Sequence, residues 1–186
     1  MQPAEYIIID VESTHGDPMR GSIIEVALIV HNGVHEIDRW NTLIGVAGPI
    51  PPFIQSLTGI RPEMLAAAPS FATVAKSLTA ALKDRIMVAH NVRYDLTVLQ
   101  HELARTGLPY HPDTLCTERL SRQLLPHLTH YNLGSLCRYF GIPQGHKHRA
   151  AHDAQATLLL LLRLIADFGE ERVRMAMVPW LHEQRA

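Results

Sequence analysis

The stretch Tyr6–Glu12 reads YIIIDVE, an isoleucine-rich apolar run that ends in two acids two positions apart. A short apolar run bounded by acids predicts a buried strand over Tyr6–Val11. Because side chains alternate along a strand, Asp10 and Glu12 are expected on the same face near its end. Neighbouring carboxylates repel each other, and hard divalent cations prefer oxygen ligands of this kind. Taken alone, the pair is better explained as two surface acids where a strand emerges.

The rest of the chain alternates between strand-like and helix-like patterns, without repeats or a low-complexity linker. The short turn His31–Gly33 favours antiparallel pairing of the strands on either side of it. Three strands followed by alternating helices and short strands predict an α/β domain with a mixed central β-sheet flanked by α-helices. The further strands are predicted over Ile23–His31, Glu36–Ile44 and Arg85–Ala89, with a loop over Gly45–Pro52. The helices are predicted from the N-cap Ser70 through Leu82 and over Tyr94–Thr106, Cys116–Leu125, Leu133–Phe140 and about Ala151–Phe168.

Composition and charge limit the class of protein. The chain has 186 residues, 47% hydrophobic and 19% charged, which is typical of one globular domain spanning residues 1–186. The net charge of −1 provides no overall basic field, so a nucleic acid would have to be held by local patches or bound metals. Cys116 and Cys137 lack CxxC spacing and indicate reduced thiols in a cytoplasmic protein. We expect no signal peptide and no membrane partner.

Two more acids stand at the starts of predicted helices. Asp95 ends the segment HNVRYD, in which a strand runs into a polar turn and a helix begins. Asp153 opens the last long helix, and His148 lies five residues earlier, where it can reach the same pocket. The helix dipole favours an acid in the first turn, which is a sufficient structural reason for each aspartate. A histidine before a helix is also more often a solvent-facing polar residue than a base.

Together, these motifs resemble the DnaQ-like (DEDDh) 3′–5′ exonuclease family, which includes the proofreading epsilon subunit of bacterial DNA polymerase III. The resemblance rests on Asp-x-Glu at the end of a strand, then His-Asn-x-x-Tyr-Asp, then His-x-x-x-x-Asp, in this order. It covers roughly Tyr6 to Phe168. The segments between the motifs also look like those of the family: Ile50–Pro52, Leu57–Ile60, Asp113–Leu115 and Asn132-Leu133.

The resemblance implies an RNase H-like fold with two Mg²⁺ or Mn²⁺ ions in the active site. By analogy with the family, Asp10 bridges both ions, and Glu12 and Asp153 bind the ion that activates the attacking water. Asp95 supports the second ion, largely through water, and His148 is the general base. A sister branch of the family has tyrosine four residues before the last aspartate; here that position is Arg149, so the histidine branch fits. The implied reaction releases nucleoside 5′-monophosphates from a 3′ end.

The resemblance also implies substrate contacts, which are expected from Ser13, Thr14, Leu57, Asn91 and Tyr94. The family commonly has Thr-Thr-Gly after the first motif, whereas this chain has Ser-Thr-His-Gly over residues 13–16. For Leu57 and Tyr94, a place in the core explains the residue as well as contact with a terminal nucleotide does. Three basic residues near the motifs are candidates for phosphate contacts or simply solvated charges: Arg93, Lys147 and Arg149.

Several alternatives stay open at this point. The expected substrate is a single-stranded or frayed 3′ end of DNA; the alternative is a 3′–5′ exoribonuclease of the same family. A histidine-rich region over residues 127–152 raises the hypothesis of a zinc hydrolase, although no His-Glu-x-x-His occurs. A non-catalytic binding module on the same fold is a further hypothesis. The segment around Trp180 could dock a polymerase or repair partner, and no long tail for such a partner is expected after it.

Overall fold

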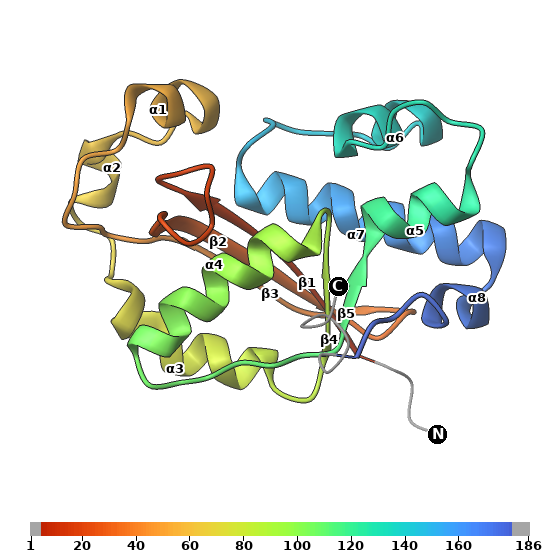
Figure 1. Ribbon diagram of the computed structural model, residues 1–186, viewed down its shortest axis with the longest axis horizontal. Coiled ribbons are helices and arrows are strands. Elements are labelled where there is room, and N and C mark those ends of the chain that lie inside the picture. The colour runs from red at the N-terminus through yellow and green to blue at the C-terminus, as the bar shows by residue number, and fades with distance from the viewer. Residues whose placement is uncertain (1–4, 180–186) are drawn as a thin grey trace.

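The computed structural model describes residues 5–179 and contains one mixed five-stranded sheet. The strand order is β3-β2-β1-β4-β5, so β1 lies at the centre (Figure 1). The first three strands are antiparallel neighbours, whereas β4 is parallel to β1 and β5 is parallel to β4. The strands are β1 (Tyr6–Ser13), β2 (Ile23–His31), β3 (Glu36–Leu43), β4 (Ile86–Ala89) and β5 (Thr114–Cys116).

Helices cover both faces of the sheet, as the sequence predicts. The helices are α1 (Pro52–Thr58), α2 (Pro62–Leu65), α3 (Phe71–Leu82), α4 (Val92–Arg105), α5 (Thr117–Leu124), α6 (Leu133–Phe140), α7 (Ala150–Phe168) and α8 (Glu170–Arg174). Ile7 and Ile9 of β1 pack with residues of α3 and α4, whereas Tyr6 and Ile8 pack with residues of α5, α6 and α7. This alternation confirms the period of two along β1. The even-numbered residues of β1, including both acids, therefore face the side of the sheet that α7 covers.

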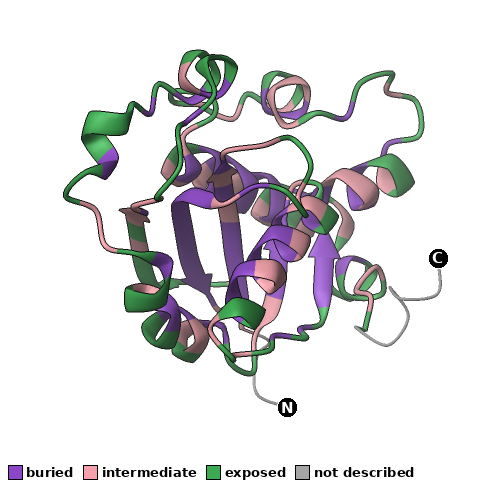
Figure 2. Cartoon of the chain, turned by 60° about the vertical axis from the view of Figure 1, so that its left-hand side comes forward, coloured by how far each residue is buried: buried purple, intermediate pink, exposed green. Residues whose placement is uncertain are grey.

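Burial follows these layers. All nine residues of β2 are buried, because helices cover both faces of this strand. In contrast, β3 is exposed along most of its length at the edge of the sheet (Figure 2). A third apolar cluster forms where α1 and α2 pack beside β2, with Ile24, Ile54 and Ile60 at its centre. Among residues 5–179, no helix is long and apolar enough to cross a membrane.

The structure corrects the predicted elements in three places. The helix predicted over Cys116–Leu125 starts one residue later, because residues 114–116 form β5, which pairs with β4. Two short helices, α1 and α2, occupy a region in which no helix is predicted, and each has a proline in its first turn. The chain also continues after α7 into the short helix α8.

Candidate active site

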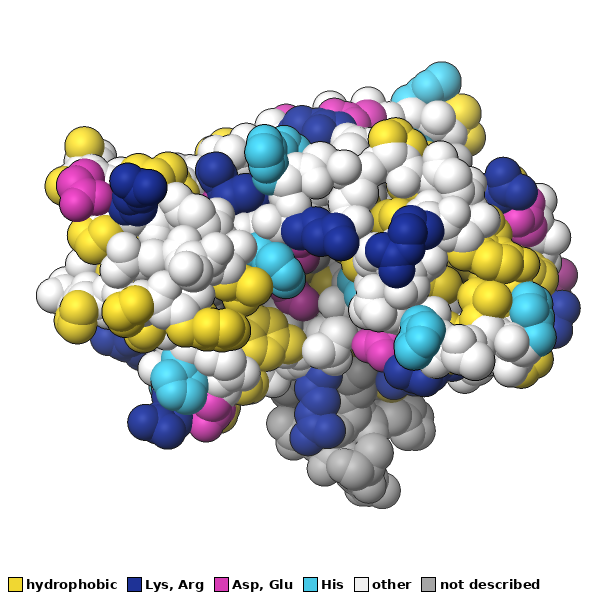
Figure 3. All heavy atoms as spheres, turned by 90° about the horizontal axis from the view of Figure 1, so that it is seen from above, with side chains coloured by type: hydrophobic (Ala, Val, Ile, Leu, Met, Phe, Trp, Pro, Cys, Tyr) yellow, Lys and Arg dark blue, Asp and Glu magenta, His cyan; other side chains and the backbone are white. Residues whose placement is uncertain are grey.

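Three elements bring four acids to one edge of the sheet. Asp10 and Glu12 lie at the end of β1, where both are half-buried. Asp95 lies in the first turn of α4 and Asp153 in the first turn of α7, and both are buried. Viewed from above, acidic side chains lie at the bottom of a hollow, with histidine and basic side chains around it (Figure 3).

The acids of this cluster disfavour each other's ionisation. Burial raises the pKa of Asp10 well above its usual range, and the charges of Asp95, Glu12 and Asp153 raise it further. Burial, followed by the charge of Asp153, raises the pKa of Glu12 to about 8. Burial also raises the pKa of Asp95 to about 7, although the Val11 N–H opposes this effect. A bound divalent cation would remove the repulsion, and carboxylate oxygens are the ligands that Mg²⁺ and Mn²⁺ prefer.

The turn between β4 and α4 sets the position of Asp95. Asn91 adopts the left-handed conformation with φ of 67°, which reverses the chain direction before the helix. The ring of His90 anchors the turn, because its Nδ1 lies 2.9 Å from Thr117 Oγ1 and its Nε2 lies 2.9 Å from the Tyr131 carbonyl oxygen. Asp95 Oδ1 then accepts a hydrogen bond of 3.1 Å from the Val11 N–H, directly between the two acids of β1.

His148 lies close to acids from two different elements. Potential ligand atoms of Glu12, His148 and Asp153 all lie within 4.8 Å of one another. Asp153 Oδ2 accepts a hydrogen bond of 2.9 Å from the His148 N–H, while the imidazole is exposed. The neighbouring His152 points elsewhere: its ring packs on Gly145, and its Nδ1 lies 3.2 Å from the carbonyl oxygen of His146. The geometry thus groups His148 with the acids; its role as a base stays a prediction.

The residues predicted to contact substrate come from α1, α4, the end of β1 and the segments next to β1 and α4. Ser13 is buried, and its hydroxyl lies 2.7 Å from the Tyr94 hydroxyl, which donates to the His15 carbonyl at 2.7 Å. These two residues therefore fix the loop after β1, and direct contact with a nucleotide stays a prediction. The same holds for Thr14, whose hydroxyl accepts from the Ser22 N–H at 3.0 Å. Leu57 on α1 and Asn91 before α4 are exposed.

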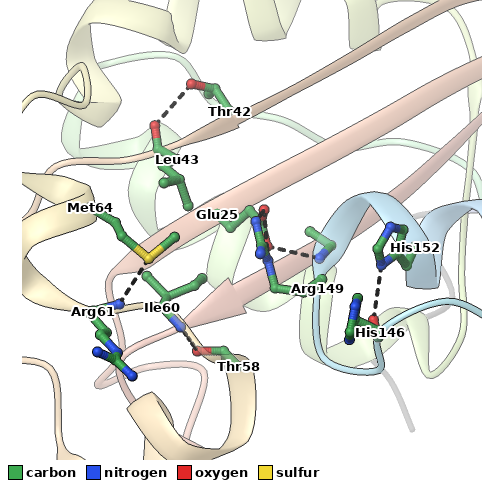
Figure 4. A network of polar contacts seen from close by, with 11 residues as sticks. Glu25, Thr42, Leu43, Thr58, Ile60, Arg61, Met64, His146, Arg149 and His152 are labelled. Carbon is green, nitrogen blue, oxygen red and sulfur yellow. Dashed lines mark hydrogen bonds and ion pairs between the residues drawn. The ribbon is translucent and has the colours of Figure 1, made fainter.

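Sequence reasoning missed Glu25 and misjudged Arg149. Glu25 lies in β2 and is only 1% exposed, yet its carboxylate receives the Arg149 guanidinium at 2.9 Å (Figure 4). Arg149 is therefore the partner of a buried acid and not simply a solvated charge, whereas its contact with phosphate stays a prediction. The signal in the sequence is a single acid within the apolar run Ile23–Val30, which a buried strand tolerates only if the acid is paired.

The histidine-rich region supplies only one histidine to the acidic cluster. Among residues 5–179, the one group of three or more potential metal ligands is the set of Glu12, His148 and Asp153. His127 instead lies near Tyr139, with Nε2 3.4 Å from the hydroxyl. Two of its three possible ligands are carboxylates, which Mg²⁺ and Mn²⁺ prefer. Zinc sites are typically richer in histidine and cysteine.

A mixed sheet with acids at the end of its central strand and on two flanking helices defines a protein of the RNase H-like class. A family model for exonucleases of the RNase T type matches residues 7–161. The chain therefore belongs to this exonuclease family, as its resemblance to DnaQ-like exonucleases predicts.

Known relatives and structures agree with this assignment. The chain is 32% identical over 188 residues to the 3′-5′ exonuclease DinG of Bacillus subtilis, covering 100% of this chain and 20% of that protein. It is 30% identical over 166 residues to a PolC-type DNA polymerase III of Caldanaerobacter subterraneus, covering 89% of this chain and 12% of that protein. The chain thus spans a fifth or less of these relatives.

Among solved structures, exonuclease X in complex with 5′ overhanging duplex DNA is similar, with a TM-score of 0.74 and 26% identity. This similarity covers 92% of the chain and 97% of exonuclease X. Exonuclease I of E. coli, in complex with a dT13 oligonucleotide, matches with a TM-score of 0.80 at 18% identity. That match covers 92% of this chain and 43% of exonuclease I, and it supports the fold alone.

Proposed function

We propose that this chain is a metal-dependent 3′–5′ exonuclease that removes nucleoside 5′-monophosphates from the 3′ end of DNA. The observation that carries the proposal is the convergence of acids from β1, α4 and α7 at one edge of the sheet, with the exposed His148 grouped with Glu12 and Asp153. The residues also fit the implied cofactor, because burial and mutual repulsion oppose ionisation of Asp10, Glu12 and Asp95 until a cation is bound. A single domain over residues 1–186 is part of the proposal.

Each side chain has a role in the proposed reaction. Asp10, Glu12, Asp95 and Asp153 would hold two Mg²⁺ or Mn²⁺ ions, which when bound would stabilise the attacking and leaving oxygens of a phosphodiester displacement. The exposed imidazole of His148 accepts a proton from the attacking water, as neutral imidazole can near pH 7. The hydrogen bond from Val11 and the left-handed turn at Asn91 hold Asp95 in place.

The proposed substrate is an unpaired or frayed 3′ end. A net charge of −1 gives the protein little hold on distant duplex, so recognition is confined to a few terminal nucleotides. DNA is favoured over RNA because one of the relatives is named as a DNA polymerase III and exonuclease X is bound to DNA. The exoribonuclease alternative would show as faster degradation of an RNA strand of the same sequence.

The test compares a 5′-labelled oligonucleotide with a covalently closed circle of the same sequence, in Mg²⁺ or Mn²⁺. A ladder that shortens from the 3′ end while the circle stays intact supports the proposal. Efficient cutting of the circle would make the protein an endonuclease. No cleavage of either substrate by the parent chain would favour the non-catalytic binding module.

A partner of the protein is a separate part of the proposal. A polymerase or repair protein could dock on the C-terminal segment around Trp180, which lies outside the described residues. In the PolC-type DNA polymerase III, the matching region makes up only 12% of a much longer protein that is named as a polymerase. An exonuclease region within a polymerase supports such an association for this chain. Co-purification of the chain with and without residues 180–186 would test it.

A further inference from the structure

An ion pair between the buried Glu25 and the half-buried Arg149 joins the sheet to the helix that carries Asp153. Glu25 of β2 stands opposite Glu12 in the pairing of β1 with β2. Its carboxylate takes two hydrogen bonds from one guanidinium: Arg149 Nη2 donates to Oε1 at 2.9 Å and Nε donates to Oε2 at 3.1 Å (Figure 4). This fork geometry fixes the direction of the arginine side chain more tightly than a single contact would.

The same carboxylate also caps α7. Arg149 is the N-cap residue of this helix, but its side chain makes no capping hydrogen bond. Instead, Glu25 Oε2 accepts a hydrogen bond of 3.0 Å from the Ala150 N–H. The first backbone N–H groups of a helix have no partners within it, and a negative charge at this end is favoured by the dipole. Glu25 therefore fixes the first turn of α7, although its strand is far from this helix in the sequence.

These contacts act on His148, the residue just before the pair. His148 has a φ of 57°, a left-handed conformation that is unfavourable for a residue with a side chain. Such a conformation persists only where the surroundings impose it. Asp153 holds the His148 N–H on one side, and Glu25 holds Arg149 and Ala150 on the other. Within residues 5–179, the imidazole itself makes no hydrogen bond that would orient it.

We propose that Glu25 and Arg149 form a positioning pair that directs His148 toward Glu12 and Asp153. The pair makes no contact with substrate in this role; it acts through the backbone of residues 148–150. The proposal rests on the exonuclease function and adds to it two residues outside the family's five-residue motif.

Three variants and one matched control test the proposal in steady-state kinetics. Arg149→Met and Glu25→Gln should lower kcat about 10- to 100-fold, as loss of a supporting partner commonly does, while KM for the oligonucleotide changes little. Arg149→Lys should recover part of the lost kcat, because lysine keeps the positive charge but cannot donate two parallel hydrogen bonds to the Glu25 carboxylate. Arg163→Met is the control, since Arg163 makes an exposed pair with Asp167 at 2.8 Å on the same helix. It should behave like the parent.

A combined variant separates positioning from general destabilisation. If Arg149 acts through His148, adding Arg149→Met to His148→Ala should cause no further loss of kcat. Losses that multiply would overturn the proposal. Should Arg149→Met fail to fold because Glu25 is left unpaired, the double variant Glu25→Gln/Arg149→Met removes both charges and takes its place.

Hydrogen exchange in the metal-free protein gives a readout that does not depend on activity. The backbone amides of His148 and Ala150 should exchange faster in Glu25→Gln and Arg149→Met than in the parent or in Arg163→Met. Unchanged exchange at both amides would overturn the positioning role, whatever the activity. If the variants show these faster exchange rates but the parent chain has no nuclease activity, the proposed function is refuted and the positioning role is kept.

Discussion

Removing the charge of Glu12 should stabilise the metal-free protein at neutral and alkaline pH. The folded chain raises the pKa of this carboxyl from 4.5 to about 8, chiefly through burial and then through the charge of Asp153. A raised pKa means that the folded state binds the proton more tightly than the unfolded state. Its contribution to stability is therefore fully present below pH 4.5 and is lost as the pH rises through about 8.

The size of this effect follows from the pKa change. At about 1.36 kcal/mol for each pKa unit, the loss of unfolding free energy between the two limits is on the order of 5 kcal/mol. Glu12 is half-buried, so solvent screening reduces the expected difference to roughly 2–4 kcal/mol. Glu12→Gln keeps the shape of the side chain and removes the charge, so it should not show this loss.

Urea unfolding in the presence of EDTA measures the effect. The unfolding free energy of Glu12→Gln relative to the parent should rise by roughly 2–4 kcal/mol between about pH 5 and about pH 8. Saturating Mg²⁺ or Mn²⁺ should remove this advantage, because the cations bind the folded parent with its carboxylates ionised. Glu63→Gln, at an exposed acid of α2, is the control and should follow the parent. Parallel pH dependences for the parent and Glu12→Gln would refute the argument from burial and repulsion.

Three further predictions concern the same hollow. Asp10→Ala or Asp153→Asn should abolish nuclease activity. Mg²⁺ or Mn²⁺ should raise the Tm of the parent more than that of Asp10→Ala, because the cations bind the folded parent more tightly. Equal rises in Tm would exclude Asp10 as a ligand. His148→Ala should lower the rate of cleavage by roughly 10²- to 10⁴-fold and keep the metal-induced rise in Tm. The control His152→Ala should keep a rate within a few-fold of the parent's. Loss of the rise in Tm in His148→Ala would instead make the imidazole a metal ligand. Tyr94→Phe removes the hydroxyl that bonds the His15 carbonyl and Ser13, and urea unfolding should show a loss of about 1 kcal/mol with the metal-induced rise unchanged.

Most of the elements that the sequence predicts have a long apolar period. Strands β1, β2, β3 and β4 and helices α3, α4, α5, α6 and α7 are confirmed with small shifts at their ends. Strand β5 has only three residues, too few for a period, and it forms because β4 offers it an edge and Val178 pairs with Thr114 on the other side. Helix α1 has seven residues that begin with a proline, and its buried Ile54 packs in the cluster beside β2. Such elements depend on tertiary contacts that no local pattern records.

The acids of the site show the same limit at the level of single residues. Each has an adequate local explanation, either as the end of a strand or as the first turn of a helix. Only the order of the three motifs connects them before the structure is known. The structure supplies the physical connection: β1 ends where α4 and α7 begin, so strand alternation and two helix starts place the carboxylates at one edge.

Charge balance explains why an additional acid and a basic residue accompany this cluster. Glu25 pairs in register with Glu12, and unpaired it would add a fifth negative charge beside Asp10, Glu12, Asp95 and Asp153. The two divalent cations of the proposed mechanism would carry a charge of +4, which matches four ionised carboxylates but not five. Arg149 pairs with Glu25 and offsets its charge, although the two residues lie 124 positions apart in the sequence. An acid in the fully buried strand β2 therefore points to a distant cation, although only the fold identifies which one.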